Sequence, residues 1–303
     1  MPQFEHRGSS LRGLTPPARL GLIHLICIAL VVVASGCAGT SRAEPDPQDD
    51  VVQALRTGGG NGGTAAAATT PTGTGWGTLK GQFVLDGAPL PATFLPTGGK
   101  DGQVCDVMPI PDQSLVVDAQ SKGIANIVVY ARKVSRIHES AKEAAAAEVV
   151  FDQKNCVFLT HIMAVQAGQP VKIKNSDPIG HNTNVSPRGD APINPLLPGG
   201  ADTTYQFTRA QTEPVAVTCN IHPWMKAYIM PRKDPYCAVT DREGRFEIAN
   251  LPAGEKIEFQ VWQEKAGPLE AKSGWSKGRF TETILADDAK DLGTIAVPAA
   301  KFQ

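Results

Sequence analysis

The chain has 303 residues, 42% of them hydrophobic, with 30 glycines and 24 prolines. This composition suits one or two compact β-domains with unstructured flanks better than a helical protein. The 29 basic residues balance 30 acidic ones, and they form no basic cluster. We therefore exclude nucleic acid as a partner, and also membrane binding driven by positive charge.

The first 37 residues have the pattern of a secretory signal. Three arginines, at positions 7, 12 and 19, precede an apolar run from Leu20 to Val33. The run is shorter than the roughly 20 apolar residues of a membrane-spanning helix, which favours a removable signal over an uncleaved anchor. It ends in "ASGC", which resembles a bacterial lipobox and would make Cys37 the lipidated first residue of an exported periplasmic or cell-envelope protein. Ordinary cleavage with a soluble product is the alternative.

Residues 38–75 are rich in Gly, Ala, Thr, Pro and Asp, which is typical of a flexible tether. The glycines do not form a phosphate-binding loop, because no apolar strand precedes them and no capped helix follows. We therefore expect the folded part to begin near Trp76.

Beyond that point, apolar and polar residues alternate in short segments, which indicates half-buried β-strands. These segments include "LKGQFVL" from Leu79, "VKIK" from Val171, "VAVTC" from Val215 and "KIEFQVW" from Lys256. Only "ESAKEAAAAEVV", residues 139–150, has the composition of a helix. The predicted fold class is therefore all-β, with a sandwich architecture.

One predicted strand ends in a group of candidate metal ligands, "CNIHPWM", which contains Cys219, His222 and Met225. The period of two places Cys219 on the same face of the strand as Val215 and Val217, toward the core. A single buried cysteine is more often an inert part of the core than a ligand. A metal site is therefore predicted only if a second segment supports it.

That second segment is "NSDPIGHN", which carries His181 in a turn at the end of an upstream strand. Antiparallel folds bring distant strand ends together, so we expect His181 to meet Cys219, His222 and Met225 at one end of a sandwich. Two imidazoles, a thiolate and a weak thioether are the ligand set of a mononuclear blue-copper site. Zinc is the nearest competing metal, but it has no use for the thioether.

Together, "NSDPIGHN" and "CNIHPWM" resemble the signature of the cupredoxins, such as plastocyanin, azurin and amicyanin, over roughly residues 156–231. The resemblance implies a Greek-key sandwich with one type 1 copper, in which His181, Cys219 and His222 are in-plane ligands and Met225 is the axial ligand. It also implies that Asn182 helps to fix the copper loop. The protein would then carry electrons between redox protein partners and would not be an enzyme.

Other copper centres need residues that the sequence lacks. A dinuclear oxidase-type centre requires two cysteines in the loop, which has one, and multicopper oxidases require His-x-His pairs, which do not occur. Two rival functions remain: a copper storage or delivery protein, and an adhesion or carbohydrate-binding module in which copper is incidental.

Three further residues have two interpretations each. His161 is either an additional ligand or support for the ligands, or an ordinary histidine with a hydrogen-bond partner. Met230 either replaces Met225 as the axial ligand or belongs to the core, which strand alternation favours. Trp224 is either a rim aromatic of the hydrophobic patch through which cupredoxins pass electrons, or an ordinary packing residue.

The segment "YCAVTDREGRFEIANLPAGEKIEFQVW", residues 236–262, resembles the carboxypeptidase regulatory-like, transthyretin-like β-sandwich. We expect hairpin turns at its "DREG" and "LPAG". "GTLKGQFVLDGAPL" from Gly77 and "GIANIVVYAR" from Gly123 resemble the first strands of that family. The predicted domains are therefore this sandwich, residues 76–133 and 234–298, and an inserted cupredoxin domain, residues 134–233. The alternative assigns the strands of residues 76–133 to the cupredoxin barrel.

Three cysteines lie outside the signal, the lipobox and the candidate metal site. An exported chain permits a disulfide. We predict a disulfide between Cys105 and Cys156 and a buried, free Cys237, although spacing alone does not fix the connectivity.

Overall fold

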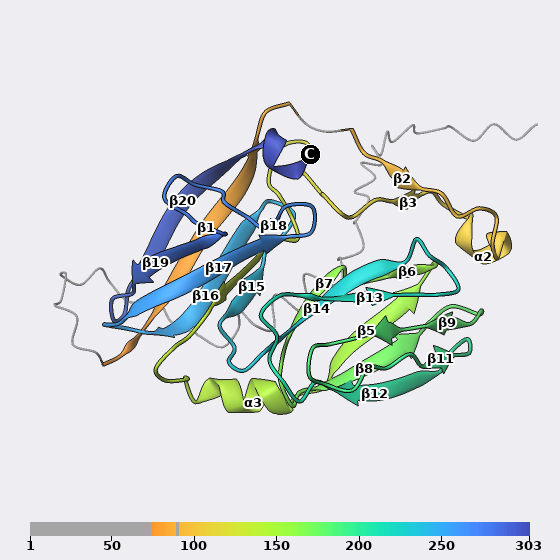
Figure 1. Ribbon diagram of the computed structural model, residues 1–303, viewed down its shortest axis with the longest axis horizontal. Coiled ribbons are helices and arrows are strands. Elements are labelled where there is room, and N and C mark those ends of the chain that lie inside the picture. Colours follow the sequence, from red (N-terminus) through yellow and green to blue (C-terminus); the bar gives the residue numbers. More distant parts are fainter. Residues whose placement is uncertain (1–73, 89–90) are drawn as a thin grey trace, which may run out of the picture. The chain divides into compact units, whose positions relative to one another are not determined.

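The computed structural model of the protein describes residues 74–88 and 91–303. The predicted signal, Cys37 and all but the end of the predicted tether lie outside these residues. Within the described residues, no helix is both long enough and apolar enough to cross a membrane. Nearly all of the regular structure is β-strand (Figure 1), so the all-β prediction is confirmed.

The first β-sandwich combines early and late strands of the chain. In one sheet, β1 (Trp76–Asp86) lies between β16 (Arg245–Pro252) and β20 (Ala289–Pro298), and Figure 1 shows the orange β1 among these blue strands. The other sheet has the order β15-β4-β17-β18, and β19 also pairs with β17. Its strands are β4 (Val128–Ala131), β15 (Cys237–Val239), β17 (Lys256–Gln263), β18 (Gly267–Pro268) and β19 (Arg279–Thr283).

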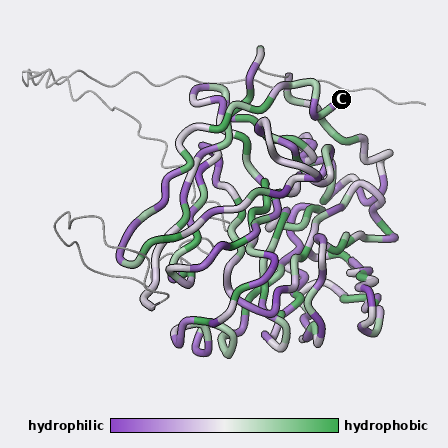
Figure 2. The backbone as a smooth tube through the Cα atoms, turned by 60° about the vertical axis from the view of Figure 1, so that its left-hand side comes forward, coloured by the Kyte–Doolittle hydropathy of each residue, from purple (hydrophilic) through white to green (hydrophobic). Residues whose placement is uncertain are grey.

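Side chains that alternate along the strands fill the space between these two sheets. Leu79 and Phe83 of β1 and Phe259 and Val261 of β17 are buried in one hydrophobic cluster. Hydrophobic and hydrophilic residues alternate along many strands in Figure 2. The period of two therefore produces a sheet with one face in the core.

The second β-sandwich is built from the middle of the chain, in sheets of order β10-β13-β14-β7 and β12-β8-β5-β6. A separate two-stranded sheet pairs β9 (His181–Asn182) with β11 (Leu196–Leu197). The strands of the two larger sheets are β5 (Val149–Lys154), β6 (Val157–Phe158), β7 (Ile162–Gln166), β8 (Pro170–Asn175), β10 (Asn184–Val185), β12 (Asp202–Gln206), β13 (Val215–Thr218) and β14 (Lys226–Arg232).

The chain therefore starts the first sandwich with β1 and β4, builds the second with β5 to β14, and returns to the first with β15 to β20. The "DREG" turn joins β15 to β16, and "LPAG" joins β16 to β17. Because β16 lies in the opposite sheet from β15 and β17, the prediction of hairpins at these turns is wrong. Each turn instead carries the chain from one sheet to the other.

The described residues contain the α-helices α2 (Gly102–Cys105) and α3 (Ser140–Ala146) and the 3-10 helix η1 (Ala299–Phe302). The predicted helix over 139–150 is too long, because Val149 and Val150 already belong to β5 and pair with β8. Valine is β-branched and favours a strand. The short α2, which the sequence did not predict, lies between β2 (Phe94–Leu95) and β3 (Ile110–Pro111).

A third buried cluster joins β4, β15 and β17 of the first sandwich to β7 and β14 of the second. In it, the rings of Tyr228 and Trp262 lie 5.0 Å apart. Met230 is part of this cluster, which confirms its interpretation as a core residue. Cys237 also lies here, buried and free as predicted, and burial raises the pKa of its thiol to about 12.

Candidate metal centre

The four predicted ligands come from two loops of the second sandwich. His181 begins β9, whereas Cys219, His222 and Met225 lie in the turn between β13 and β14. The short strand β10 follows β9 and pairs with the last residues of β13, immediately before Cys219. This pairing explains how His181 reaches a turn that is distant in the sequence.

Three of these ligands converge on one point. The Nδ1 atoms of His181 and His222 are 2.9 Å apart, and Sγ of Cys219 lies 3.8 Å from Nδ1 of His222. One donor atom from each of the three residues lies within 4.8 Å of the others, and all three residues are buried. The donors therefore enclose a single point that is shielded from solvent.

The outer nitrogen of each imidazole is held by a carboxylate. Nε2 of His181 lies 2.8 Å from Oδ2 of Asp177, which is itself buried. Nε2 of His222 lies 2.9 Å from Oδ2 of Asp101, whose side chain is 37% exposed. Both rings therefore have a fixed orientation with Nδ1 pointing inward.

This arrangement fits a transition metal with an affinity for nitrogen and sulfur. A carboxylate that accepts a hydrogen bond from Nε2–H of a neutral imidazole leaves Nδ1 as an electron-pair donor. Two such nitrogens 2.9 Å apart repel each other unless a proton or a cation lies between them. Imidazole and thiolate donors suit copper or zinc, whereas magnesium and calcium prefer oxygen.

Electrostatics favour a thiolate at Cys219. Burial opposes its ionisation, but hydrogen bonds with His181, Asn182 and His222 outweigh burial and lower the pKa of the thiol from 9.0 to about 6. Burial likewise opposes protonation of His181, yet its hydrogen bonds with Asp177 and Cys219 raise the pKa of its ring to about 9. A proton on His181 thus balances the thiolate when no metal is bound, and a metal cation would replace it.

Asn182 holds the turn that carries the other ligands. Its Oδ1 accepts hydrogen bonds from the backbone nitrogens of Asn220, at 2.8 Å, and Ile221, at 3.3 Å. The thiol of Cys219 lies 3.4 Å from the same oxygen. The expectation that Asn182 helps to fix this loop is confirmed.

Met225 closes the same turn. Its backbone nitrogen donates to the carbonyl of His222 at 2.9 Å, and its carbonyl accepts from the nitrogen of Cys219 at 3.3 Å. Its side chain is 1% exposed and packs in the same cluster as Cys219. The turn therefore fixes the spacing of the three residues, and the role of Met225 as a ligand stays a prediction.

His161 and Trp224 both have hydrogen-bond partners in the structure. His161 is buried, and its Nε2 lies 2.7 Å from Oε2 of Glu264, so it is an ordinary histidine with a hydrogen-bond partner. Trp224 donates from Nε1 to the carbonyl of Cys156 at 3.0 Å, and its ring centroid lies 5.1 Å from that of His222. Trp224 is thus a packing residue beside a candidate ligand, and its role in electron transfer stays a prediction.

Cys105 and Cys156 form a disulfide, as predicted. Cys156, Asp177 and His181 make a second group with the spacing of metal ligands. Because the sulfur of Cys156 is bonded to Cys105, that group is not a second metal site while the disulfide is intact.

Three polar residues around the centre were not predicted from the sequence. Asn175 and Asp177 lie within "NSDPIGHN", and a run of polar residues just before a candidate ligand was a usable signal. Nδ2 of Asn175 donates to the carbonyls of Ile179 and Leu197 at 2.7 and 2.9 Å, which shapes the turn before His181. Asp101 had no such signal, because it is remote from both motifs.

Comparison with known proteins found no matching protein-family model and no matching curated protein. Among solved structures, 59 chains match. A copper-containing nitrite reductase from Thermus scotoductus SA-01 is 23% identical, with 28% of this chain and 22% of that chain covered and a TM-score of 0.26. A proline-to-glycine variant of amicyanin, in its reduced Cu(I) form at pH 4, is 22% identical, with 34% of this chain and 98% of that chain covered and a TM-score of 0.26. The similarity is thus partial and is to cupredoxins.

Proposed function

We propose that the protein is an exported electron carrier that binds one copper ion through His181, Cys219 and His222, with Met225 as a weak axial ligand. The observation that carries the proposal is the convergence of the two Nδ1 atoms and the Sγ atom on one buried point. Imidazoles suit both copper oxidation states, and the soft thiolate of Cys219 suits Cu(I).

The surroundings of the ligands support electron transfer rather than chemistry on a substrate. His181 and His222 are fully buried and Cys219 is 2% exposed, so the donors are shielded from a substrate in solution. Asn182, Asp177 and Asp101 hold the loop and both rings in place. Ligands that move little on a change of oxidation state keep the barrier to electron transfer low.

One spectroscopic experiment tests the proposal. The purified protein, loaded with Cu(II), should absorb intensely near ~600 nm, as expected for a Cu(II) thiolate with two histidines. Cys219→Ser should abolish this band, whereas Cys237→Ser should keep it, because Cys237 is buried in the cluster between the sandwiches. A protein that takes up copper without the band would contradict the proposal.

The axial role of Met225 has its own test. Met225→Leu should keep the band but raise the reduction potential, because a lost thioether donor destabilises Cu(II) relative to Cu(I). An unchanged potential would remove Met225 from the ligand set and leave the three-ligand proposal intact.

Export is proposed from the first 37 residues. Mass spectrometry of the mature protein should find a lipid on an N-terminal Cys37 and hence an anchor at the cell envelope. An unmodified terminus at another residue would rule the lipid out.

The electron partners are proposed to be redox proteins. Rapid exchange of copper with solution would instead favour the alternative function of copper storage or delivery.

A further inference from the structure

Residues 94–111 contribute no strand to the sheets of either sandwich, and we call this segment the cover. Within the described residues, its strands β2 and β3 pair only with each other, at Phe94 with Pro111 and Leu95 with Ile110, and α2 lies between them. Although the cover follows β1 of the first sandwich, its Cys105 and Ile110 are buried in the core cluster of the second. It is therefore docked where the candidate metal centre lies.

The cover contacts the metal centre directly through Asp101. Asp101 precedes α2 with a φ of 51°, and its side chain makes no hydrogen bond to the helix it caps. The carboxylate instead lies 2.9 Å from Nε2 of His222. Aspartate usually caps a helix through its side chain, and here the carboxylate contacts the ring of His222 instead.

The disulfide fixes the cover beside this contact. The backbone nitrogen of Cys105 donates to the carbonyl of Asp101 at 3.0 Å, so one turn of chain joins the bridge to the carboxylate. On the other side, the backbone nitrogen of Cys156 donates to Oδ2 of Asp177 at 2.8 Å, the atom that also holds His181. The disulfide therefore connects the outer partners of both imidazoles.

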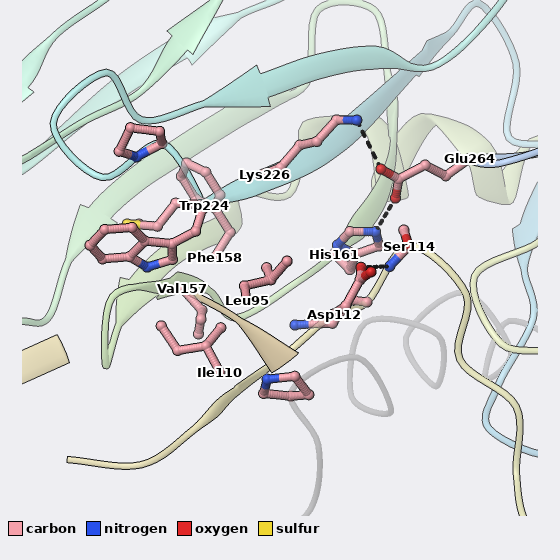
Figure 3. A pocket seen from close by; sticks show the side chains of 14 residues that line it. Leu95, Ile110, Asp112, Ser114, Val157, Phe158, His161, Trp224, Lys226 and Glu264 are labelled. Carbon is pink, nitrogen blue, oxygen red and sulfur yellow. Dashed lines mark hydrogen bonds and ion pairs between the residues drawn. The ribbon is translucent and has the colours of Figure 1, made fainter. Parts of the chain in front are cut away.

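Packing of the cover is incomplete on its other side. A cavity of about 200 Å³ is lined by Leu95 and Ile110 of the cover and by Trp224 and Met225 of the ligand turn. Figure 3 shows Leu95, Ile110 and Trp224 around this space, with His161 and Glu264 at its polar end. Walls that do not touch contribute little attraction, so on this side the disulfide and Asp101 add to the attachment that the buried Cys105 and Ile110 provide.

We propose that the cover is a disulfide-tethered shield over the metal centre, in which Asp101 is a positioning residue that orients His222 and keeps the metal from exchanging with solution. This inference rests on the proposed copper centre. It explains why His222 is fully buried although its outer partner Asp101 is a surface residue. It also predicts that the tether, rather than the ligands alone, determines how fast metal leaves.

The test measures copper removal from the loaded full-length protein by excess EDTA, followed as loss of the thiolate band. Asp101→Gly removes the carboxylate and suits the positive φ. Cys105→Ala/Cys156→Ala removes the tether without leaving a thiol beside Asp177 and His181. Both should release copper roughly tenfold faster or more, because loss of a partner of a metal-bound histidine typically lowers metal affinity by at least that factor, and loss of the disulfide frees the segment that holds Asp101.

Two matched variants separate the contact from a general effect of charge. Asp101→Asn keeps an acceptor for the ring and should release copper at an intermediate rate. Asp106→Asn removes a charge from the same segment, but its carboxylate pairs with Thr97, so its rate should equal that of the wild type. Equal rates for wild type, Asp101→Gly and the double alanine variant would overturn the proposal.

A second readout needs no metal. In the metal-free wild type, diethyl pyrocarbonate should leave His222 unmodified in peptide mass spectra, and Asp101→Gly should expose it. His161, which is buried against Glu264, should stay unmodified in both and so report that the variant is folded. If His222 stays protected in Asp101→Gly, the cover does not shield the centre through Asp101, which would overturn this proposal. A missing thiolate band in the wild type would contradict only the proposed copper centre.

Discussion

Asp177 and His181 form a buried carboxylate–imidazole pair, with 2.8 Å between Oδ2 and Nε2. The same carboxylate accepts from the backbone nitrogens of Asn155 and Cys156 at 2.6 and 2.8 Å. Although burial opposes its ionisation, these contacts lower the pKa of Asp177. One side chain thus orients the ring of His181 and fixes the backbone at the disulfide.

Asp177→Asn should therefore weaken metal binding by roughly 10- to 100-fold, because an amide is a poorer acceptor for the imidazole proton. Competition with a chelator of known affinity measures this effect. Asp152→Asn is the control, since Asp152 lies in the same region but accepts a hydrogen bond from the hydroxyl of Ser176 and not from a histidine ring. Equal affinity of both variants would show that Asp177 does not support His181.

Asn182→Ala should destabilise the metal-free protein by about 1–3 kcal/mol, because the backbone nitrogens of Asn220 and Ile221 would both lose their acceptor. Urea unfolding measures the change. Asn184→Ala is the matched control, because the side chain of Asn184 makes an exposed contact of 3.3 Å to Asn220, and it should cost much less. If both variants lose the same stability, the turn is held by its own backbone hydrogen bonds and not by Asn182.

The network of Glu264, His161 and Lys226 should make stability depend on pH in acid. Burial opposes ionisation of Glu264, but its bonds to His161 and Lys226 lower its pKa from 4.5 to about 2. A carboxyl group with a depressed folded pKa contributes stability that is complete above about pH 4.5 and is lost as pH falls toward 2. The stability difference between wild type and Glu264→Gln should therefore be largest near pH 6 and shrink toward pH 3. A difference that stays constant in urea unfolding over this range would contradict the assignment.

Gly244 and Gly293 offer a paired test of how the first sandwich packs. Both have positive φ, 77° and 66°. A Cβ on Gly244 would lie 2.0 Å from the carbonyl oxygen of Phe83, whereas one on Gly293 would meet nothing within 4 Å. Gly293→Ala should cost about 1–2 kcal/mol from backbone strain, and Gly244→Ala considerably more. Thermal unfolding measures both changes. Equal losses of stability would mean that the "DREG" turn is not in close contact with the backbone of β1.

Much of the candidate centre was predictable from the sequence. The alternation in "VAVTC" placed Cys219 on an inward face, and the short spacing in "CNIHPWM" brought His222 close to it, because strand phase and turn length are local properties. The predicted strands at Leu79, Val171, Val215 and Lys256 are all present. The end of α3 was misjudged because Val149 pairs with Val171 of β8, a partner that local propensity does not contain.

The sequence by itself determined the fold class, the inward-facing thiol and the donor types, because all of these follow from period, spacing and chemistry within short segments. Only the tertiary structure decided which groups complete the centre. Asp101 reaches His222 through a cover anchored by Cys105, and Asp177 joins His181 to Cys156. Both contacts join residues whose proximity depends on how the chain packs, and no periodicity encodes such a contact.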